Sequence, residues 1–201
     1  LGAAVGWFVP FLTIPAAIVG FVLALVNIFK KQPSGALVLA YSAFEGVFVG
    51  GISRYYETAF GGVVTQAVVA TIIVVGVTLA LFASGKIRAS KKATKVFLIA
   101  MVGYVVFSLV NVVLMFTGAT DDAFGLRSAE IPFLGIPFGV VLGVLVVIMA
   151  AYSLVLDFDF IQKGAANGAP RAYGWKGAFG IMVTVIWLYL ELLRFFAILR
   201  D

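Results

Sequence analysis

Six stretches of about 20 apolar residues recur along this chain of 201 residues, and they constrain its fold more than any other feature. A helix of about 20 residues crosses the roughly 30 Å of hydrocarbon in a bilayer. The stretches are continuously apolar and lack the alternation of a membrane β-barrel. We therefore predict an all-α, polytopic membrane helix bundle with six full spans. The predicted spans cover approximately 6–29, 35–53, 60–84, 96–117, 133–156 and 177–199.

The connections between these spans are short and contain the Gly, Pro, Asn and Ser residues that interrupt helices. None is long enough to hold a soluble domain. We therefore expect one transmembrane domain over residues 1–201. The chain begins with Leu rather than Met, which favours an incomplete or processed N-terminus.

The basic residues divide unequally between alternate connections. One side holds ten of them, and the other holds three, with most of the acidic loop residues beside them. The first side contains Lys30, Lys31, Lys86, Arg88, Lys91, Lys92, Lys95, Lys163, Arg171 and Lys176. The second contains Arg54, Arg127 and Arg200, with Glu57, Asp121, Asp122, Glu130 and Asp201. The positive-inside rule predicts that the first side is cytoplasmic and that the C-terminus lies outside.

Composition excludes several function classes. The chain has no Cys and no His, which removes disulfides, thiolate nucleophiles, and thiolate or imidazole metal sites. No catalytic motif or phosphate loop is visible, so we expect no enzyme activity and no tightly bound cofactor. The net charge of +5 comes from loop residues between apolar spans. It indicates contact with lipid headgroups rather than with nucleic acid.

Two acids, Asp157 and Asp159, stand where the fifth apolar stretch gives way to a polar connection. At a helix end they could simply be solvated. Carboxylates near a helix C-terminus oppose the helix dipole, however, so neither is there for local stability. Phe158 and Phe160 alternate with them, which suggests that one acid faces the bundle.

Other polar side chains fall at membrane depth, where each charged one costs about 2.5–3.5 kcal/mol on insertion scales. By helix rise, Glu45, Gln66, Asn111, Glu191 and Arg194 could form a polar cluster in the outer half of the bundle. Glu191 and Arg194 have the i,i+3 spacing of an ion pair, which we favour. The alternative is that Arg194 reaches the interface and leaves Glu191 to titrate. Glu45 could instead hold two helices together by a hydrogen bond.

The order of elements resembles the Bax inhibitor-1 (transmembrane Bax inhibitor motif) family in its bacterial form. The resemblance is carried by AYSLVLDFDFIQ and WLYLELLRFFAIL near the end, with GWFVP and FEGVFVGGIS near the start. It implies seven helices, of which the first is largely missing here, and a last helix at the centre. It also implies a pH-sensitive calcium leak, gated by two aspartates that share a proton.

The resemblance assigns the first gating aspartate to Asp157. The second position is open: one alignment of the last helix places Thr184 there, and the other places Glu191. Seven residues separate them, so they share one helix face about 10 Å apart.

Together these features favour a passive calcium or cation leak channel of the bacterial inner membrane, gated by protonation of embedded carboxylates. Calcium is the expected permeant ion, because hard cations prefer oxygen ligands. The expected partners are the lipid bilayer and calcium ions. The alternative is a non-conducting interaction protein that regulates a membrane protease or a stress or death pathway through membrane-protein partners.

Overall fold

The computed structural model describes residues 1–120 and 122–200. Within them, six helices are long and apolar enough to cross a membrane, which confirms the predicted bundle. The spanning helices are α2 (Thr13–Phe29, preceded by the 3-10 turn η1, Pro10–Leu12), α3 (Gly35–Ala59), α4 (Val63–Ala83), α5 (Lys91–Phe116), α6 (Phe138–Ala166) and α7 (Tyr173–Ile198). A short helix, α1 (Gly2–Phe8), precedes them and packs against α3.

Several helix boundaries differ from the predicted spans by four residues or more, including the end of α3 at Ala59 rather than at 53. Helix α5 begins at Lys91, because Ser90 caps it by accepting a hydrogen bond of 3.2 Å from the Ala93 amide, and the lysines that follow favour helix. Helix α6 continues to Ala166, since nothing interrupts it before Asn167 and Gly168, whose φ is +66°.

The extension of α6 changes the setting of the two aspartates. Asp157 lies nine residues before the last residue of α6, about 14 Å along the axis. The prediction that Asp157 and Asp159 stand at a helix end is therefore wrong. Their relation to the helix dipole carries no weight at this distance, because the dipole acts within the last turn.

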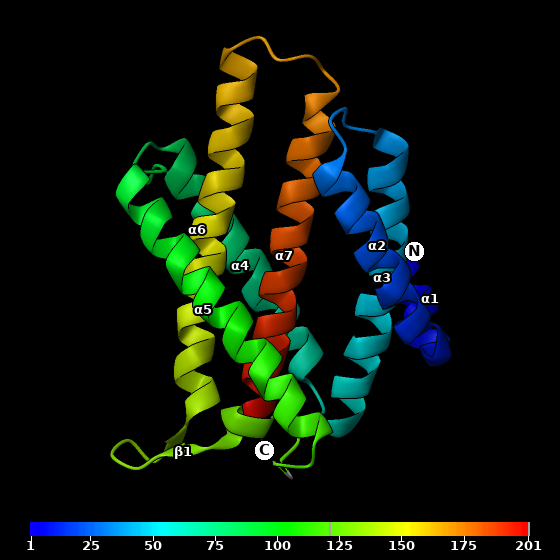
Figure 1. Ribbon diagram of the computed structural model, residues 1–201, viewed down its shortest axis with the longest axis vertical. Coiled ribbons are helices and arrows are strands. Elements are labelled where there is room, and N and C mark those ends of the chain that lie inside the picture. The colour runs from blue at the N-terminus through cyan, green and yellow to red at the C-terminus, as the bar shows by residue number, and fades with distance from the viewer. Residues whose placement is uncertain (121, 201) are drawn as a thin grey trace.

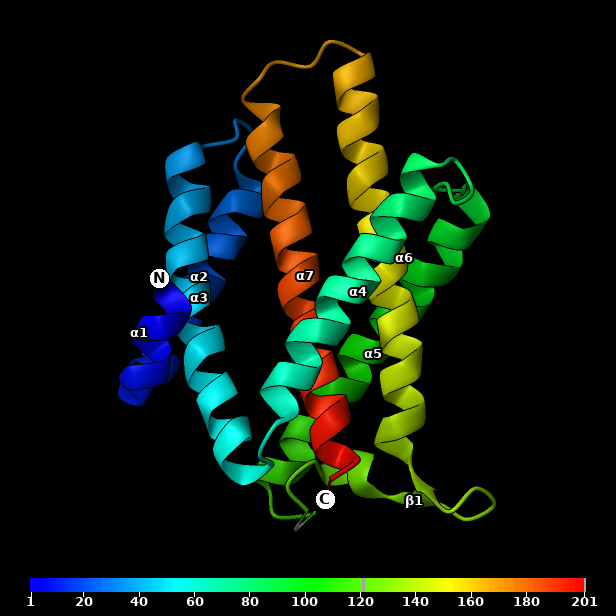
Figure 2. The same cartoon turned by 180° about the vertical axis from the view of Figure 1, so that it is seen from behind.

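Helix α7 lies between the α2–α3 side of the bundle and the α4–α6 side, in both views (Figures 1 and 2). It packs most extensively on α6 and α4, and it also contacts α3. The main core cluster joins α4, α6 and α7 through the fully buried residues Val63, Ala67, Ala150, Leu154, Leu188 and Leu193. A last helix held on several sides agrees with the central position that the family resemblance implies.

The connection between α5 and α6 folds back against the bundle. It contains the 3-10 turn η2 (Gly125–Ser128) and an antiparallel pair, β1 (Glu130–Ile131) with β2 (Ile136–Pro137). Arg127 on η2 is only 3% exposed. Arg127 counts among the connection residues on the predicted outer side, but its side chain enters the bundle.

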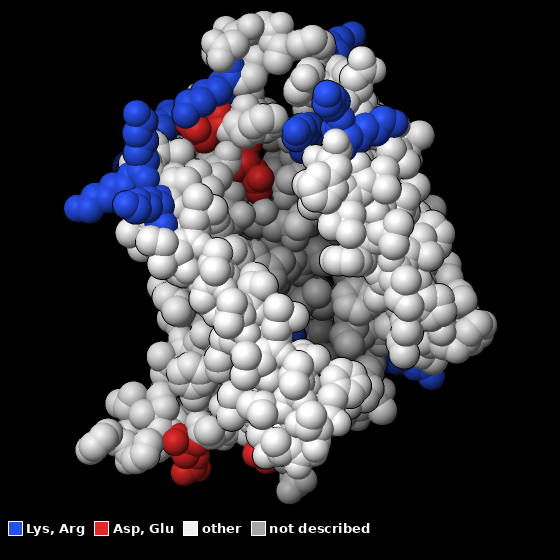
Figure 3. Space-filling view, viewed as in Figure 1, with Lys and Arg blue, Asp and Glu red and all other residues white. Residues whose placement is uncertain are grey.

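Charged side chains gather at the two ends of the molecule (Figure 3). Lys and Arg dominate the end formed by the α2–α3, α4–α5 and α6–α7 connections, which we call the lysine-rich end. The opposite end carries Glu130 and Asp122 beside the C-terminus, and we call it the acidic end. Asp121 and Asp201, also counted on that side, lie outside the described residues.

Candidate functional site

A polar link joins α6 to α7 in the half of the bundle nearer the lysine-rich end. The Thr184 hydroxyl donates a hydrogen bond of 2.7 Å to Oδ2 of Asp157. Oγ of Ser153 lies 3.2 Å from Oγ1 of Thr184. Because the single Thr184 proton goes to Asp157, Ser153 must donate to Thr184 when Asp157 is ionised. The three side chains then form a directed chain that ends on the carboxylate.

Helix spacing explains how this link forms. Ser153 and Asp157 are four residues apart on α6, and Gly180 and Thr184 are four apart on α7, so each pair lies on one helix face. Gly180 brings the helices close: a Cβ atom at this position would lie 2.7 Å from Oδ1 of Asp157. Thr184 is 5% exposed, and Asp157 is partly buried. The carboxylate therefore lies between two helices rather than in the aqueous connection.

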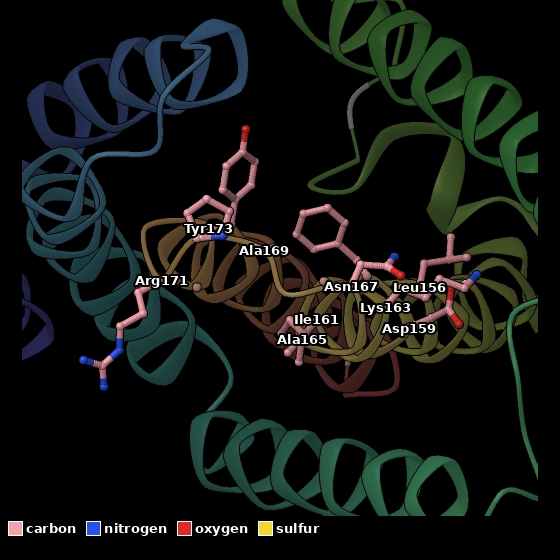
Figure 4. A pocket seen from close by; sticks show the side chains of 13 residues that line it. Leu156, Asp159, Ile161, Lys163, Ala165, Asn167, Ala169, Arg171 and Tyr173 are labelled. Atoms are coloured by element: carbon pink, nitrogen blue, oxygen red, sulfur yellow. Dashed lines mark ion pairs between the residues drawn. The ribbon is translucent and has the colours of Figure 1, made fainter.

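Asp159 has a different environment. Two helical residues are separated by about 200° around the axis, so Asp157 and Asp159 cannot face the same partner. Oδ2 of Asp159 forms an ion pair of 2.6 Å with Nζ of Lys163, whose side chain is 68% exposed. Asp159 also lines a cavity of about 550 Å³ beside the end of α6 and the α6–α7 connection (Figure 4). Asp159 thus lies toward the lysine-rich end of α6, paired with a surface lysine.

The contact with Asp157 distinguishes the two candidates for the second gating position. Thr184 touches Asp157, whereas Glu191 lies two turns further along α7 among other partners. Oε1 of Glu191 is 2.6 Å from Nη1 of Arg194, which is the i,i+3 pair that the spacing predicts. This site therefore pairs one carboxylate with one hydroxyl, and the diacid of the family pattern has no counterpart at these contacts.

Glu191 has two further partners that the sequence did not indicate. Nη1 of Arg127 lies 3.1 Å from Oε2 of Glu191, and both side chains are almost fully buried. The Tyr104 hydroxyl also donates to Glu191 Oε1. The only sequence signal for Arg127 is that it stands alone in an otherwise acidic connection.

Asn111 positions this arginine. Its Oδ1 accepts a hydrogen bond of 2.7 Å from the Leu126 amide, and its Nδ2 donates to the Phe124 carbonyl at 3.2 Å. These bonds hold the η2 turn against α5, so that Arg127 points toward Glu191. Asn111 therefore supports the cluster through the backbone.

The predicted polar cluster is only partly correct. Glu191, Arg194 and Asn111 come together at the acidic end, but Glu45 and Gln66 do not join them. The Glu45 carboxylate packs against Gly20 of α2, and Gln66 is exposed on α4. Depth along a helix can be read from the sequence, whereas the direction around the axis depends on how the helices pack.

Acidic side chains do not gather into a metal site in the part of the chain that the structure describes: no group of three or more could hold an ion. Thr184 and Glu191 instead belong to two separate polar contacts along α7. The Asp157–Thr184 link lies toward the lysine-rich end, and the Glu191 cluster lies toward the acidic end.

Six apolar helices around buried polar contacts define a multi-pass helical membrane protein. The chain belongs to the Bax inhibitor 1 like family, whose model matches residues 1–201. A search of curated proteins finds no match to the chain.

Proposed function

We propose that this protein is a passive calcium or cation leak of the bacterial inner membrane, gated by protonation of Asp157. The observation that carries this proposal is the hydrogen bond from Thr184 to Asp157, which places a titratable carboxylate between α6 and α7. No second carboxylate touches Asp157 in the described residues. The ionisation of Asp157 alone therefore sets the charge at this point of the proposed cation path.

The hydroxyl chain gives the gate a specific chemistry. Ionised Asp157 accepts from Thr184 and leaves one negative charge between the helices, where it attracts cations. Protonated Asp157 is neutral and can donate to Thr184, which then donates to Ser153. Protonation thus removes the charge without breaking the link between the helices. Flux should rise with pH as the carboxylate ionises.

The orientation belongs to the same proposal. The lysine-rich end faces the cytoplasm and the C-terminus lies outside, as the uneven distribution of loop lysines and arginines favours. Asp159 and Lys163 would then stand at the cytoplasmic mouth, and the Glu191 cluster would lie on the outer side.

The test is calcium flux into liposomes that contain the purified protein, followed with a trapped calcium indicator at a series of symmetric pH values. The proposal expects flux above protein-free liposomes and an increase with pH. Flux that is absent at every pH would refute the leak and favour the non-conducting interaction protein.

A further inference from the structure

A cavity of about 510 Å³ lies between α5, η2 and α7 at the acidic end. One face of α5 lines it with Tyr104, Ser108 and Asn111, which follow the i, i+4, i+7 spacing of a helix stripe. Helix α7 contributes Glu191 and Arg194 to the opposite wall. Polar side chains from two helices therefore converge on one space.

The charged groups of this cavity do not balance. Arg127 and Arg194 each carry one positive charge, and Glu191 carries the single negative charge that pairs with both. Tyr104 is neutral. One positive charge is left over in a region where Arg127 and Glu191 are each 3% exposed. Because an uncompensated charge is costly away from water, the site favours an anion.

Hydrogen-bond donors also remain available. Arg194 has five N–H donors, and among the described residues its side chain donates one hydrogen bond, to Oε1 of Glu191. Its side chain is 31% exposed and lines the cavity. Oγ of Ser108 is buried and has no hydrogen-bond partner in the described part of the chain. Arg194 can therefore donate to a group inside the cavity, and Ser108, whose hydroxyl is buried in the cavity wall, can do so after a change of side-chain rotamer.

The mouth of the cavity is apolar. Leu109 and Val112 line it and are exposed on the outer face of α5, by 63% and 46%. Arg194 lies four residues before Ile198, about 6 Å from the end of α7. Helix α7 has 26 residues and is about 39 Å long, so in a bilayer with about 30 Å of hydrocarbon Arg194 would lie close to the headgroup boundary. An amphiphile could then place its charged group in the cavity and its chains against α5.

We propose that this cavity binds one phosphate group, held by Arg194 and Ser108. The planar guanidinium matches phosphate oxygens with two parallel hydrogen bonds. The single negative charge of a phosphodiester would neutralise the excess charge of the cluster. Two sources share this chemistry: the headgroup of an anionic lipid and free inorganic phosphate. The proposal does not depend on cation flux.

The lipid source is tested with fluorescence quenching in nanodiscs. The chain has three Trp residues, so Trp7→Phe with Trp175→Phe leaves only Trp187, which lines the cavity. Brominated phosphatidylglycerol is compared with equally brominated phosphatidylcholine at a low mole fraction. We expect stronger quenching by phosphatidylglycerol. Arg194→Gln should lower the relative affinity for it about tenfold, as expected for the loss of a charge-assisted hydrogen bond.

Three further variants separate binding from general effects. Arg200→Gln removes the same charge from an exposed position at the same end and should leave the preference unchanged. Ser108→Ala removes a hydroxyl that has no partner in the described protein, so it should weaken the preference without loss of fold. Arg194→Lys should retain part of it, because charge remains while the two-pronged geometry is lost.

The free-phosphate source is tested by titrating inorganic phosphate against the thermal unfolding temperature in phosphatidylcholine nanodiscs. One result assigns the site to free phosphate rather than to lipid. In that result phosphate raises the unfolding temperature of the parent but not that of Arg194→Gln or Ser108→Ala, and the two brominated lipids quench equally. The proposal would be overturned if both lipids quench equally and phosphate does not change the unfolding temperature of the parent. A lipid preference that persists in both Arg194→Gln and Ser108→Ala would also overturn it.

Discussion

The Thr184 hydroxyl donates a 2.7 Å hydrogen bond to the carboxylate of Asp157, 27 positions earlier in the chain and on the neighbouring helix. A hydroxyl cannot share a proton with a carboxylate as a second acid would. It can reverse the direction of its hydrogen bond when Asp157 becomes protonated. The site should therefore titrate as one carboxylate, with a single transition.

Asp157→Asn should flatten the pH dependence of cation flux, because an amide cannot ionise. A lone titrating carboxylate changes its ionised fraction up to about tenfold per pH unit on the acid side of its midpoint. Asp159→Asn serves as the matched control, and it should preserve most of the dependence, since Asp159 pairs with Lys163 at the exposed mouth. Flux is measured in liposomes at equal protein density. Equal effects of the two changes would indicate a shared, solvated acidic mouth.

Thr184→Val should move the midpoint of flux to higher pH, because it removes the hydrogen bond that stabilises ionised Asp157 while keeping a similar volume. Thr184→Ser keeps the hydroxyl and should behave like the parent. Thr184→Asp should move the midpoint of flux to higher pH, since two adjacent carboxylates cannot both ionise cheaply. A midpoint unchanged in Thr184→Asp would show that residue 184 does not act on the gate.

Glu191 pairs with Arg127 as well as with Arg194, and this changes the result expected for Arg194→Gln. Removing Arg194 alone leaves Glu191 paired with Arg127, at 3.1 Å, so Glu191 should stay ionised and the pH profile of flux should stay close to that of the parent. Arg127→Gln combined with Arg194→Gln removes both partners and should add a second transition. The measurement is flux against pH in folded, monodisperse protein. A second transition in Arg194→Gln alone would contradict this role for Arg127.

Glu191→Gln should destabilise the protein by about 3 kcal/mol, because it leaves the buried guanidinium of Arg127 and the partly exposed one of Arg194 without a counter-charge. Adding Arg127→Met restores the excess charge of the parent cluster, from two positive charges back to one, and should recover part of the loss. The free energy of unfolding in mixed detergent micelles is the measurement. If the double variant is less stable than Glu191→Gln alone, charge balance is not what this cluster provides.

The absence of Cys allows a direct test of orientation. A single Cys at Asn167, exposed in the α6–α7 connection, should react with an impermeant thiol reagent only from the cytoplasm. A single Cys at Ala123, exposed at the acidic end, should react only from outside. Labelling is compared in intact cells and inverted membrane vesicles. The reverse pattern would place Asp159 at the outer mouth.

Local properties of the sequence were enough to predict the six spans, because the length and continuous apolarity of a stretch decide whether it can cross a bilayer. The same holds for the pair of Glu191 with Arg194, since residues three apart on a helix are neighbours wherever the helix lies. The resemblance of the chain to a known family, whose most specific motif residues lie in the last third, likewise needed no structure, and the match over residues 1–201 confirms it.

Tertiary structure decided which polar groups meet. Helix rise gives the depth of Glu45, Gln66 and Asn111, but only packing fixes which way each points around its axis, so just one of these three reaches the Glu191 cluster. The choice between Thr184 and Glu191 depended in the same way on the face that α7 turns toward α6. Arg127 comes from a connection whose fold is set by long-range contacts, and no local pattern in the sequence places its guanidinium beside Glu191, 64 positions away.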